Sequence, residues 1–280
     1  MTDYTIAIYC FMDDYLKVSQ PKMDARRQVS DAEILTIAVL SAQYRRAAPF
    51  YGNQHTAYQY MRQHHGMAKL DKSNLNRHLH RLADTLVSIF VALGQNIKEL
   101  NTESRYLIDS FPVAVCKNIR IKNCQLLQNE AYRGYNASKR QYFYGFKVQV
   151  VTTADGTPVD YYITAGSIHD NTALQSMQLD LPQGSELYAD SAYIHYELED
   201  LYEECDQIRL LVERKSNSKR QDSAAMRFLK KYYRKRIETS FSEITAHFPA
   251  KIHAVTPKGF LLKIVLFLFA FTFKKTLSAT

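Results

Sequence analysis

Hydrophobic residues recur at helical spacing through residues 1–100 of the chain. The segment Ser30-Asp31-Ala32-Glu33 matches a capping box and predicts a helix that begins just before the apolar run Ile34–Leu40. A shorter helix is predicted around Thr56–Gln63, followed by a turn at Gly66. A third helix is predicted from apolar residues that share one helical face: Leu75, Leu79, Leu82, Leu86, Ile89 and Leu93.

The last of these helices carries polar residues suited to DNA contact. Ser73 is its predicted N-cap, and Gly94 stands where a C-terminal cap is expected. Its polar face presents amides, a histidine and two arginines, namely Asn74, Asn76, Arg77, His80 and Arg81. The short helix, the turn and this helix are compatible with a helix-turn-helix reader of the major groove. The alternative is a plain pair of helices within a bundle.

Beyond residue 100 the hydrophobic spacing changes from a helical to a strand-like pattern. Arg105–Val113 is a short strand-like run that contains Asp109. In Phe143–Thr152 apolar and polar side chains alternate between two faces, and the same alternation returns in Val159–Thr164. The turn residues Asp155-Gly156 lie between these two runs, so the sequence predicts a β-hairpin.

Four further elements are predicted after the hairpin. They are a brief strand Glu186–Asp190 that ends on its acid, a helix-like stretch Tyr193–Cys205, a buried strand Ile208–Glu213 and a long helix from about Ser223 to His247. This order predicts an α/β fold in which helices pack on a mixed sheet. We therefore predict an all-helical domain over residues 1–100 and an α/β domain over residues 101–280.

Charged residues are gathered into blocks along a chain whose formal net charge is +8. Residues 214–236 contain ten basic residues and one acid, and residues 117–147 contain seven basic residues and one acid. Residues 180–213 contain ten acids and one arginine. Basic blocks of this kind indicate contact with the phosphate backbone of a nucleic acid. The alternative for either block alone is a solvated helix face.

Other features of the composition exclude several classes of protein. The four cysteines lie far apart without zinc-ligand spacing, which excludes a disulfide scaffold and favours a reducing compartment. The apolar segment Gly259–Lys275 is interrupted by Lys263, so its uninterrupted part is too short for a membrane span of roughly 20 residues. We expect a cytoplasmic protein without a membrane partner.

Three acids stand at positions where a purely structural role is unusual. Asp109 lies within one strand-like run and Asp190 at the end of another, although Asp is disfavoured in strands. Glu238 lies in the long basic helix. Two strand-end aspartates and a helix-borne glutamate can converge on one or two divalent ions, and hard oxygen ligands favour Mg²⁺. In the alternative interpretation Asp190 is a helix N-cap, and Glu238 pairs with Arg234 one turn earlier.

Two further groups of residues have two interpretations each. His169-Asp170 precedes an apolar helical stretch, and a helix cap is its simplest interpretation. The alternative places His169 or Asp170 at the rim of the metal site. Lys139, Arg140 and Lys147 either contact phosphates or solvate an exposed strand.

The segments around the three acids resemble the motif blocks of a known family. LIDSFPV around Asp109, YADSAY around Asp190 and YYRKRIETSFSEI around Glu238 resemble those of bacterial insertion-sequence transposases of the DDE type, which have an RNase H-like core. The resemblance covers about residues 100–275, and the separations of 81 and 48 residues between successive acids also fit. It implies an RNase H-like mixed sheet flanked by helices, preceded by an all-helical DNA-binding domain.

The resemblance also implies which residues carry the chemistry. Asp109, Asp190 and Glu238 take the places of the catalytic acids that hold the metal, here two Mg²⁺ ions that Mn²⁺ can replace. Arg234 keeps the place of the family's arginine four residues before the glutamate, whereas Thr245 stands where the family has a lysine. Glu243 is a rival for the third acid.

The implied function is that of a DNA transposase. It would cleave and transfer strands at the terminal inverted repeats of an insertion sequence, with double-stranded DNA as substrate and target and a homodimer as the active complex. The predicted DNA-contacting residues are Arg77, Arg81, Lys139, Arg140, Lys230, Lys231, Arg234, Lys235 and Arg236. Two alternatives remain open: a metal-dependent DNA nuclease without strand transfer, and a catalytically inactive DNA-binding relative.

Overall fold

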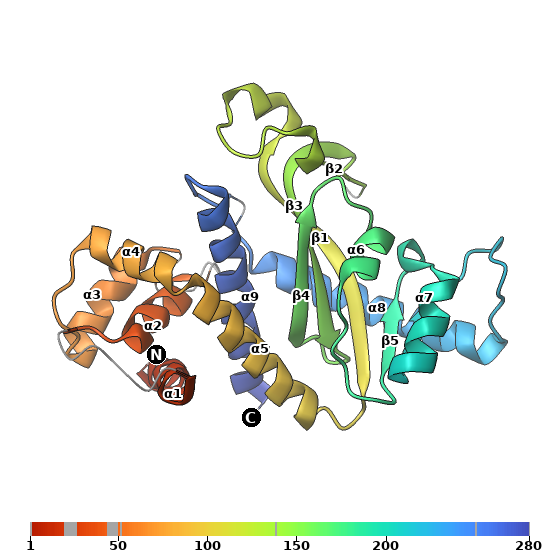
Figure 1. Cartoon of the computed structure of the whole chain (residues 1–280), viewed down its shortest axis with the longest axis horizontal. Coiled ribbons are helices and arrows are strands. Elements are labelled where there is room, and N and C mark those ends of the chain that lie inside the picture. Colours follow the sequence, from red (N-terminus) through yellow and green to blue (C-terminus); the bar gives the residue numbers. More distant parts are fainter. Residues whose placement is uncertain are drawn as a thin grey trace. The chain divides into compact units, whose positions relative to one another are not determined.

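A computed structural model of the chain describes residues 2–19, 27–43, 50, 52–137, 139–249 and 251–279 (Figure 1). The chain divides into two compact units. The first comprises residues 1–92 together with 246–280, and the second comprises residues 93–245. The sequence placed residues 246–280 in the α/β part, whereas the structure groups them with the N-terminal helices. The functions of the two parts stay predictions.

The first unit is built from helices around one central helix. Its elements are α1 (Thr2–Ser19), α2 (Asp31–Ser41), α3 (Gln54–His65), α4 (Lys72–Arg81), the first part of α5 (Ala83–Leu100) and α9 (Pro257–Ala279). Helix α2 is buried along almost its whole length and packs against α1, α3, α4 and α9. A helix that is apolar on all sides is stable only inside a core, which explains its central place.

The start of α2 is as predicted, and α9 is a buried helix. The capping box is present at α2: the Glu33 amide donates to Ser30 Oγ at 3.1 Å, and the Ser30 amide donates to Glu33 Oε2 at 2.7 Å. Helix α9 is largely buried, and phenylalanines on it contact Phe11 of α1 and Phe90 of α5. No helix in the described part of the chain, α9 included, is long and apolar enough to cross a membrane.

The second unit is a mixed sheet with helices. Its strands are β1 (Arg105–Lys117), β2 (Arg133–Asn136), β3 (Gln141–Thr153), β4 (Pro158–Ala165), β5 (Glu186–Ala189) and β6 (Arg209–Val212). Its short 3-10 helices are η1 (Asn118–Asn123), η2 (Glu130–Tyr132) and η3 (Ser191–Tyr193). Its longer helices are α6 (Asp170–Ser176), α7 (Tyr196–Leu201), which continues into a π-helical turn η4 (Tyr202–Asp206), and α8 (Ala224–Ala246).

The strands of the second unit form one mixed sheet, as the sequence predicts. The sheet runs β2-β3-β1-β5-β6, with β4 also paired to β3. β1 is antiparallel to β3 and parallel to β5, and β5 is parallel to β6. The predicted hairpin is confirmed as the antiparallel pair of β3 and β4. The predicted fold class, a mixed sheet flanked by helices, is therefore confirmed.

One part of the sheet was not predicted. Strand β2 pairs with the beginning of β3, at residues 141–144, while β4 pairs with residues 146–152. Because β1 occupies one edge of β3, β2 and β4 share the other edge in succession. In Figure 1, β2 and the neighbouring short helices lie at the far end of β3, beyond β4. The sequence showed only a basic, polar stretch here, because a strand of four residues is too short for alternation to be recognised.

The helix predicted from Ser73 to Gly94 is in fact two helices. Helix α4 ends at Arg81, and α5 begins at Ala83 and continues past Gly94 to Leu100. Asp71, not Ser73, is the N-cap of α4, because its carboxylate accepts from the amides of Ser73 and Asn74. Gly94 lies inside α5 and faces β4. A Cβ at this position would approach the Val159 carbonyl oxygen to 2.1 Å, so the close packing of helix and strand requires glycine here.

Substitution of Gly94 by alanine is expected to destabilise the protein by about 1–3 kcal/mol, because the added methyl group meets backbone and not a movable side chain. Helix propensity alone predicts the opposite sign, a gain of about 1 kcal/mol. Denaturant unfolding of Gly94→Ala distinguishes the two, with Ser88→Ala on the exposed surface of the same helix as the control. A Gly94→Ala variant that is more stable than wild type would contradict the close approach of α5 to β4.

Candidate active site

Two of the predicted acids lie next to each other on adjacent parallel strands. Ile108 of β1 pairs with Ala189 of β5. Asp109 is the next residue within β1, which continues to Lys117, and Asp190 is the first residue after β5. Asp109 Oδ1 accepts a hydrogen bond from the Ser110 amide at 2.7 Å. Asp190 Oδ1 accepts from the Ala192 amide at 2.7 Å and caps η3, so the N-cap interpretation of Asp190 is correct as far as it goes. The cap uses one carboxylate oxygen of Asp190.

Helix α8 carries the third acid across the same strands. Tyr233 stacks on Tyr188 of β5 with ring centroids 4.0 Å apart, and Phe241 meets Phe111 of β1 edge to face at 6.4 Å. Tyr188 lies two residues before Asp190, and Phe111 lies two residues after Asp109. Strand side chains alternate between faces, so Asp109 and Phe111 project toward α8.

Glu238 lies between these two contacts of α8. It follows the buried Ile237 and is itself 66% exposed. Its Oε1 accepts from Arg234 Nε at 3.3 Å, one turn earlier, so the predicted i,i+4 ion pair is present. Arg234 also pairs with Glu213, which follows β6. The predicted local pairing of Glu238 is therefore present, and the contacts of Tyr233 and Phe241 place the part of α8 on either side of Glu238 against β5 and β1.

The electrostatic environment of Asp109 shows that the acids lie close together. The pKa of Asp109 is raised from 3.8 to about 7, foremost by burial and also by neighbouring negative charges. Those charges belong to Asp190, Asp170 and Glu238, while the hydrogen bond from the Ser110 amide lowers the pKa.

Asp190 has a similar environment. Burial raises its pKa, and the charges of Asp170 and Glu213 raise it as well. The Arg234 guanidinium and the Ala192 amide lower it. Five carboxylates and one arginine therefore act on each other at this edge of the sheet: Asp109, Asp170, Asp190, Glu213, Glu238 and Arg234. Such an accumulation of negative charge favours a cation.

Within the described ranges, no three His, Cys, Asp or Glu side chains are arranged so that they could hold a metal ion. The arginine contact of Glu238 provides a physical reason, because it directs that carboxylate along α8. The carboxylates of Asp109, Asp190 and Glu238 nevertheless fit a hard divalent cation chemically, since carboxylate oxygens are the ligands that Mg²⁺ prefers.

Asp170 belongs to a network on the other side of β1. It is the first residue of α6, and His169 at the N-cap position makes no side-chain cap. Asp170 Oδ1 accepts from Ser110 Oγ at 2.6 Å and from Gln149 Nε2 at 3.0 Å, and lies 3.4 Å from Lys147 Nζ. Lys147 is therefore engaged in an ion pair, and the charge of Asp170 acts on Asp109. A place for His169 or Asp170 at the rim of a metal site stays a prediction.

Two residues of this network, Tyr193 and Gln149, were not predicted as site residues from the sequence. Tyr193 is fully buried and donates to Gln149 Oε1 at 2.6 Å, and burial raises its pKa well above the usual value. The charges of Asp109, Asp170 and Asp190 raise it further. Gln149 is completely buried although alternation predicted an outward position, because both faces of β3 are covered. A polar residue in an apolar run was the only available signal for Gln149.

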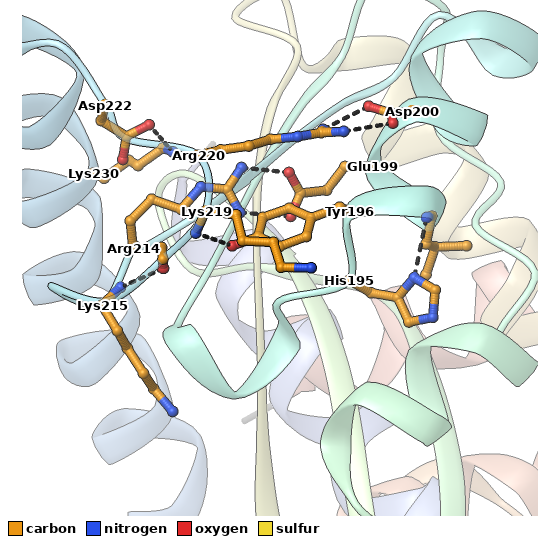
Figure 2. A network of polar contacts seen from close by, with 12 residues as sticks. His195, Tyr196, Glu199, Asp200, Arg214, Lys215, Lys219, Arg220, Asp222 and Lys230 are labelled. Atoms are coloured by element: carbon orange, nitrogen blue, oxygen red, sulfur yellow. Dashed lines mark hydrogen bonds and ion pairs between the residues drawn. The ribbon is translucent and has the colours of Figure 1, made fainter.

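The basic loop before α8 is folded by ion pairs. Figure 2 shows Arg214 paired with Glu199 of α7, Arg220 paired with Asp200, and the Tyr196 ring beside both arginines. The Tyr196 hydroxyl accepts from the Lys219 amide at 3.0 Å. The Arg214–Glu199 pair is bidentate and almost completely buried. Part of the acidic block thus neutralises part of the basic block.

The predicted DNA-contacting residues of α8 differ in accessibility. Lys230 is buried, with 4% of its side chain exposed, and pairs with Asp222 at 2.7 Å. A phosphate can reach Lys230 only if this ion pair opens, so Lys230 is not accessible to DNA in this conformation. Lys231, Lys235 and Arg236 are exposed, and no described carboxylate pairs with them. Arg236 donates to the Ala154 carbonyl at 3.1 Å.

The other predicted DNA contacts are all on the surface. Lys139 and Arg140 are exposed in the turn between β2 and β3. In the first unit, Arg77 and Arg81 are exposed on α4, and Arg77 donates to Asn74 Oδ1 at 2.7 Å. Their positions are compatible with the predicted roles but do not test them.

A comparison with known families identifies the class of protein. A family model described as a transposase DDE domain matches residues 97–250, which is more than half of the chain. The chain therefore belongs to the transposase DDE domain family, as the motif resemblance predicted. Membership implies transposase-type cleavage of DNA and binding to DNA. No curated protein and no solved structure matches the chain.

The raised pKa of Asp109 predicts a specific dependence of stability on pH. Because the folded-state pKa of about 7 lies above the ordinary 3.8, the folded state binds more protons and the wild type loses stability as the pH rises between these values. Asp109→Asn keeps the oxygen that accepts from Ser110 and removes the charge. It is expected to raise the melting temperature by about 5 °C at about pH 8 without divalent ions, and to have little effect near pH 4.

Calorimetric melting curves of both proteins across this pH range provide the measurement. Glu204→Gln, which changes an exposed acid of the same unit, is the control and is expected to leave the melting temperature unchanged. A constant difference between wild type and Asp109→Asn at every pH would contradict the electrostatic account of Asp109.

Proposed function

We propose that this chain is a DNA transposase that cleaves and transfers DNA strands at the terminal inverted repeats of an insertion sequence. Asp109, Asp190 and Glu238 are the proposed catalytic acids. The observation that supports the proposal is the register of β1 and β5, which sets Asp109 and Asp190 next to each other, with the Asp190 and Glu238 charges adding to the effect of burial on the pKa of Asp109. Membership of the family supports it.

We further propose that the same acids hold two Mg²⁺ ions, which Mn²⁺ can replace. Asp109 on β1 and Asp190 just after β5 would each offer carboxylate oxygens, and Glu238 would join them if its side chain turned from Arg234 toward the two aspartates. Bound ions of this kind increase the nucleophilicity of water or of a 3′-hydroxyl and stabilise the leaving oxygen. Arg234, released from Glu238, still pairs with Glu213 and keeps its place beside the site.

The proposed reaction has two in-line displacements. Water attacks a phosphodiester at the end of the element and breaks the bond to the 3′-oxygen, which leaves as a free 3′-hydroxyl opposite a 5′-phosphate. That hydroxyl then attacks a phosphodiester of the target and releases a new 3′-hydroxyl there. Neither step needs a covalent bond to the protein, so no nucleophilic serine, tyrosine or cysteine is required.

DNA binding is proposed to rest on exposed cations. In the second unit these are Lys231, Arg234, Lys235 and Arg236 on α8 and Lys139 and Arg140 in the turn before β3. In the first unit they are Arg77 and Arg81 on α4. Cations at these positions would contact phosphates of duplex DNA, both the terminal repeats and the target. Two DNA ends must meet for transfer, so a homodimer is the proposed active form.

The catalytic proposal is tested with a DNA fragment that bears the gene's own flanking ends. In Mg²⁺ the wild type is expected to cleave this fragment and join its 3′-end to a target, and Glu238→Gln is expected to reduce cleavage by about 100-fold or more. Glu243→Gln is the matched control on the same helix and is expected to retain activity within about threefold.

Other outcomes of this assay separate the alternatives. Cleavage without joining of a pre-cleaved 3′-end would favour a nuclease without strand transfer. Specific binding without cleavage would favour a catalytically inactive relative. Loss of activity in Glu243→Gln with activity retained in Glu238→Gln would reverse the assignment of the third acid.

The DNA-contacting role of α8 is tested by two neighbouring lysines. Lys231→Ala is expected to weaken binding to duplex DNA and to lower the slope of log K against log salt by about 1. Lys230→Ala is expected to lower the free energy of unfolding by about 3 kcal/mol, because it leaves Asp222 buried without its partner. DNA titrations at several salt concentrations and denaturant unfolding measure the two effects. A DNA-binding defect in Lys230→Ala but not in Lys231→Ala would contradict the assignment of Lys231 to DNA contact and of Lys230 to a buried ion pair.

A further inference from the structure

The hairpin of β2 and β3 exposes aromatic side chains that the proposed reaction does not use. Tyr135 and Tyr142 are directly opposite each other in the pairing of these strands and therefore lie on the same face. Their ring centroids are 4.9 Å apart. Tyr135 is 52% exposed and Tyr142 is 47% exposed, although a tyrosine pair of this kind usually packs on a neighbouring element.

The tyrosine pair is held in a fixed position. The Arg133 guanidinium lies 4.5 Å from the centre of the Tyr142 ring, so one side of the pair is covered by a cation. Below it, Tyr144 is buried and donates its hydroxyl to Glu130. In the turn, the Lys139 amide donates to Asn136 Oδ1 at 3.1 Å, and the Arg140 amide donates to the Ala137 carbonyl at 3.2 Å. An aromatic surface that is already ordered loses little entropy when a flat ligand binds.

The charge around the tyrosines selects the kind of ligand. Residues 117–147 contain seven basic residues and one acid, and Lys139 and Arg140 are exposed next to the pair in the turn. A second copy of this chain docked through the same face would bring two positive surfaces together, which is unfavourable. A polyanion with flat, unsaturated groups satisfies both features, because its phosphates meet the cations and its bases stack on the rings.

We propose that the hairpin of β2 and β3 binds single-stranded DNA, with an unpaired base stacked on Tyr135 and Tyr142 and flanking phosphates held by Lys139 and Arg140. Duplex DNA offers its base faces only where strands are unpaired, so the hairpin distinguishes a frayed or overhanging end from intact duplex. This inference rests on the proposed function, since it assigns the hairpin to the DNA that is being processed.

The tyrosine pair lies at a defined distance along β3 from the acidic group. Val150 pairs with Asp109, and Tyr142 lies eight residues earlier on the same strand. At about 3.3 Å per residue, this separates the tyrosines from the acidic group by about 26 Å along the strand. Stacked nucleotides at about 3.4 Å each cover the same length in about eight steps. A single-stranded segment of about this length therefore connects the two places.

Binding to three DNAs of one sequence, in EDTA to prevent cleavage, tests the inference. They are a single strand, a duplex with a single-stranded overhang of about 12 nucleotides, and the blunt duplex. The double variant Tyr135→Ala/Tyr142→Ala is expected to bind the first two about tenfold more weakly and the blunt duplex with unchanged affinity. The matched variant Tyr135→Phe/Tyr142→Phe keeps both rings and is expected to bind all three like the wild type.

A charge variant separates stacking from electrostatic attraction. Lys139→Ala/Arg140→Ala is expected to weaken binding to the single strand and to lower the salt dependence of that binding. The difference in affinity between the overhang duplex and the blunt duplex, which the tyrosines provide, is expected to persist. Equal losses for all three DNAs in the Tyr→Ala variant would overturn the stacking role. If the wild type binds none of the DNAs, the proposed function fails; if it binds all of them and the Tyr→Ala variant does too, only this inference fails.

Photo-crosslinking of the wild type tests the same claim without any substitution. 5-Iododeoxyuridine placed at successive positions of the overhang crosslinks to an aromatic ring on which it stacks. The crosslink is expected in the tryptic peptides that contain Tyr135 (residues 134–139) or Tyr142 (residues 141–147), from positions about eight nucleotides from the cleavage site. Crosslinks confined to other peptides, such as those of α4 or α8, would refute it, as would oligomerisation of the protein through this hairpin without DNA.

Discussion

The parallel pairing of β1 with β5 is the constraint on which the account of this protein depends. It places Asp109 and Asp190 one residue beyond the same pair of partners, Ile108 and Ala189. At that edge the carboxylates are partly buried and act on one another, as the pKa of Asp109 near 7 shows. A fold optimised for stability alone would not gather negative charge there. A cation bound there would offset this negative charge, and this links the topology of the sheet to the chemistry expected of a DDE transposase.

Ion pairs in the loop before α8 determine which cations remain for DNA. Arg214 and Lys230 are buried against Glu199 and Asp222, and these contacts fix the path of the chain into α8. The helix in turn lies over β5 and β1 through Tyr233 and Phe241. The basic block of the sequence therefore has two physical roles. Some of its members, Arg214 and Lys230, form buried ion pairs at the start of α8, and others are exposed on α8 and available to phosphates.

The sequence predicted the elements with strong periodicity and missed those that depend on tertiary contacts. The strands that carry Asp109 and Asp190, the hairpin of β3 and β4 and the long helix with Glu238 all follow from local patterns and were confirmed. The continuation of α5 through Gly94 was predicted wrongly, since a glycine that signals a helix end in isolation here permits close packing against Val159. Burial of Gln149 could not be predicted because its partners are distant in sequence. Pairing of Lys230 with Asp222 could not be predicted either, because it depends on the path of the loop before α8.

The most direct test of the central claim replaces Mg²⁺ by Fe²⁺, which in the presence of ascorbate and peroxide cuts the polypeptide backbone close to where the ion is bound. The account predicts cuts clustered near residues 109, 190 and 238, suppressed by excess Mg²⁺ and absent in Asp109→Asn. These three sites lie on separate elements, so their joint cleavage would show that β1, β5 and α8 enclose one cation site. Cuts elsewhere, for example only beside His64-His65, or an unchanged pattern in Asp109→Asn, would contradict it.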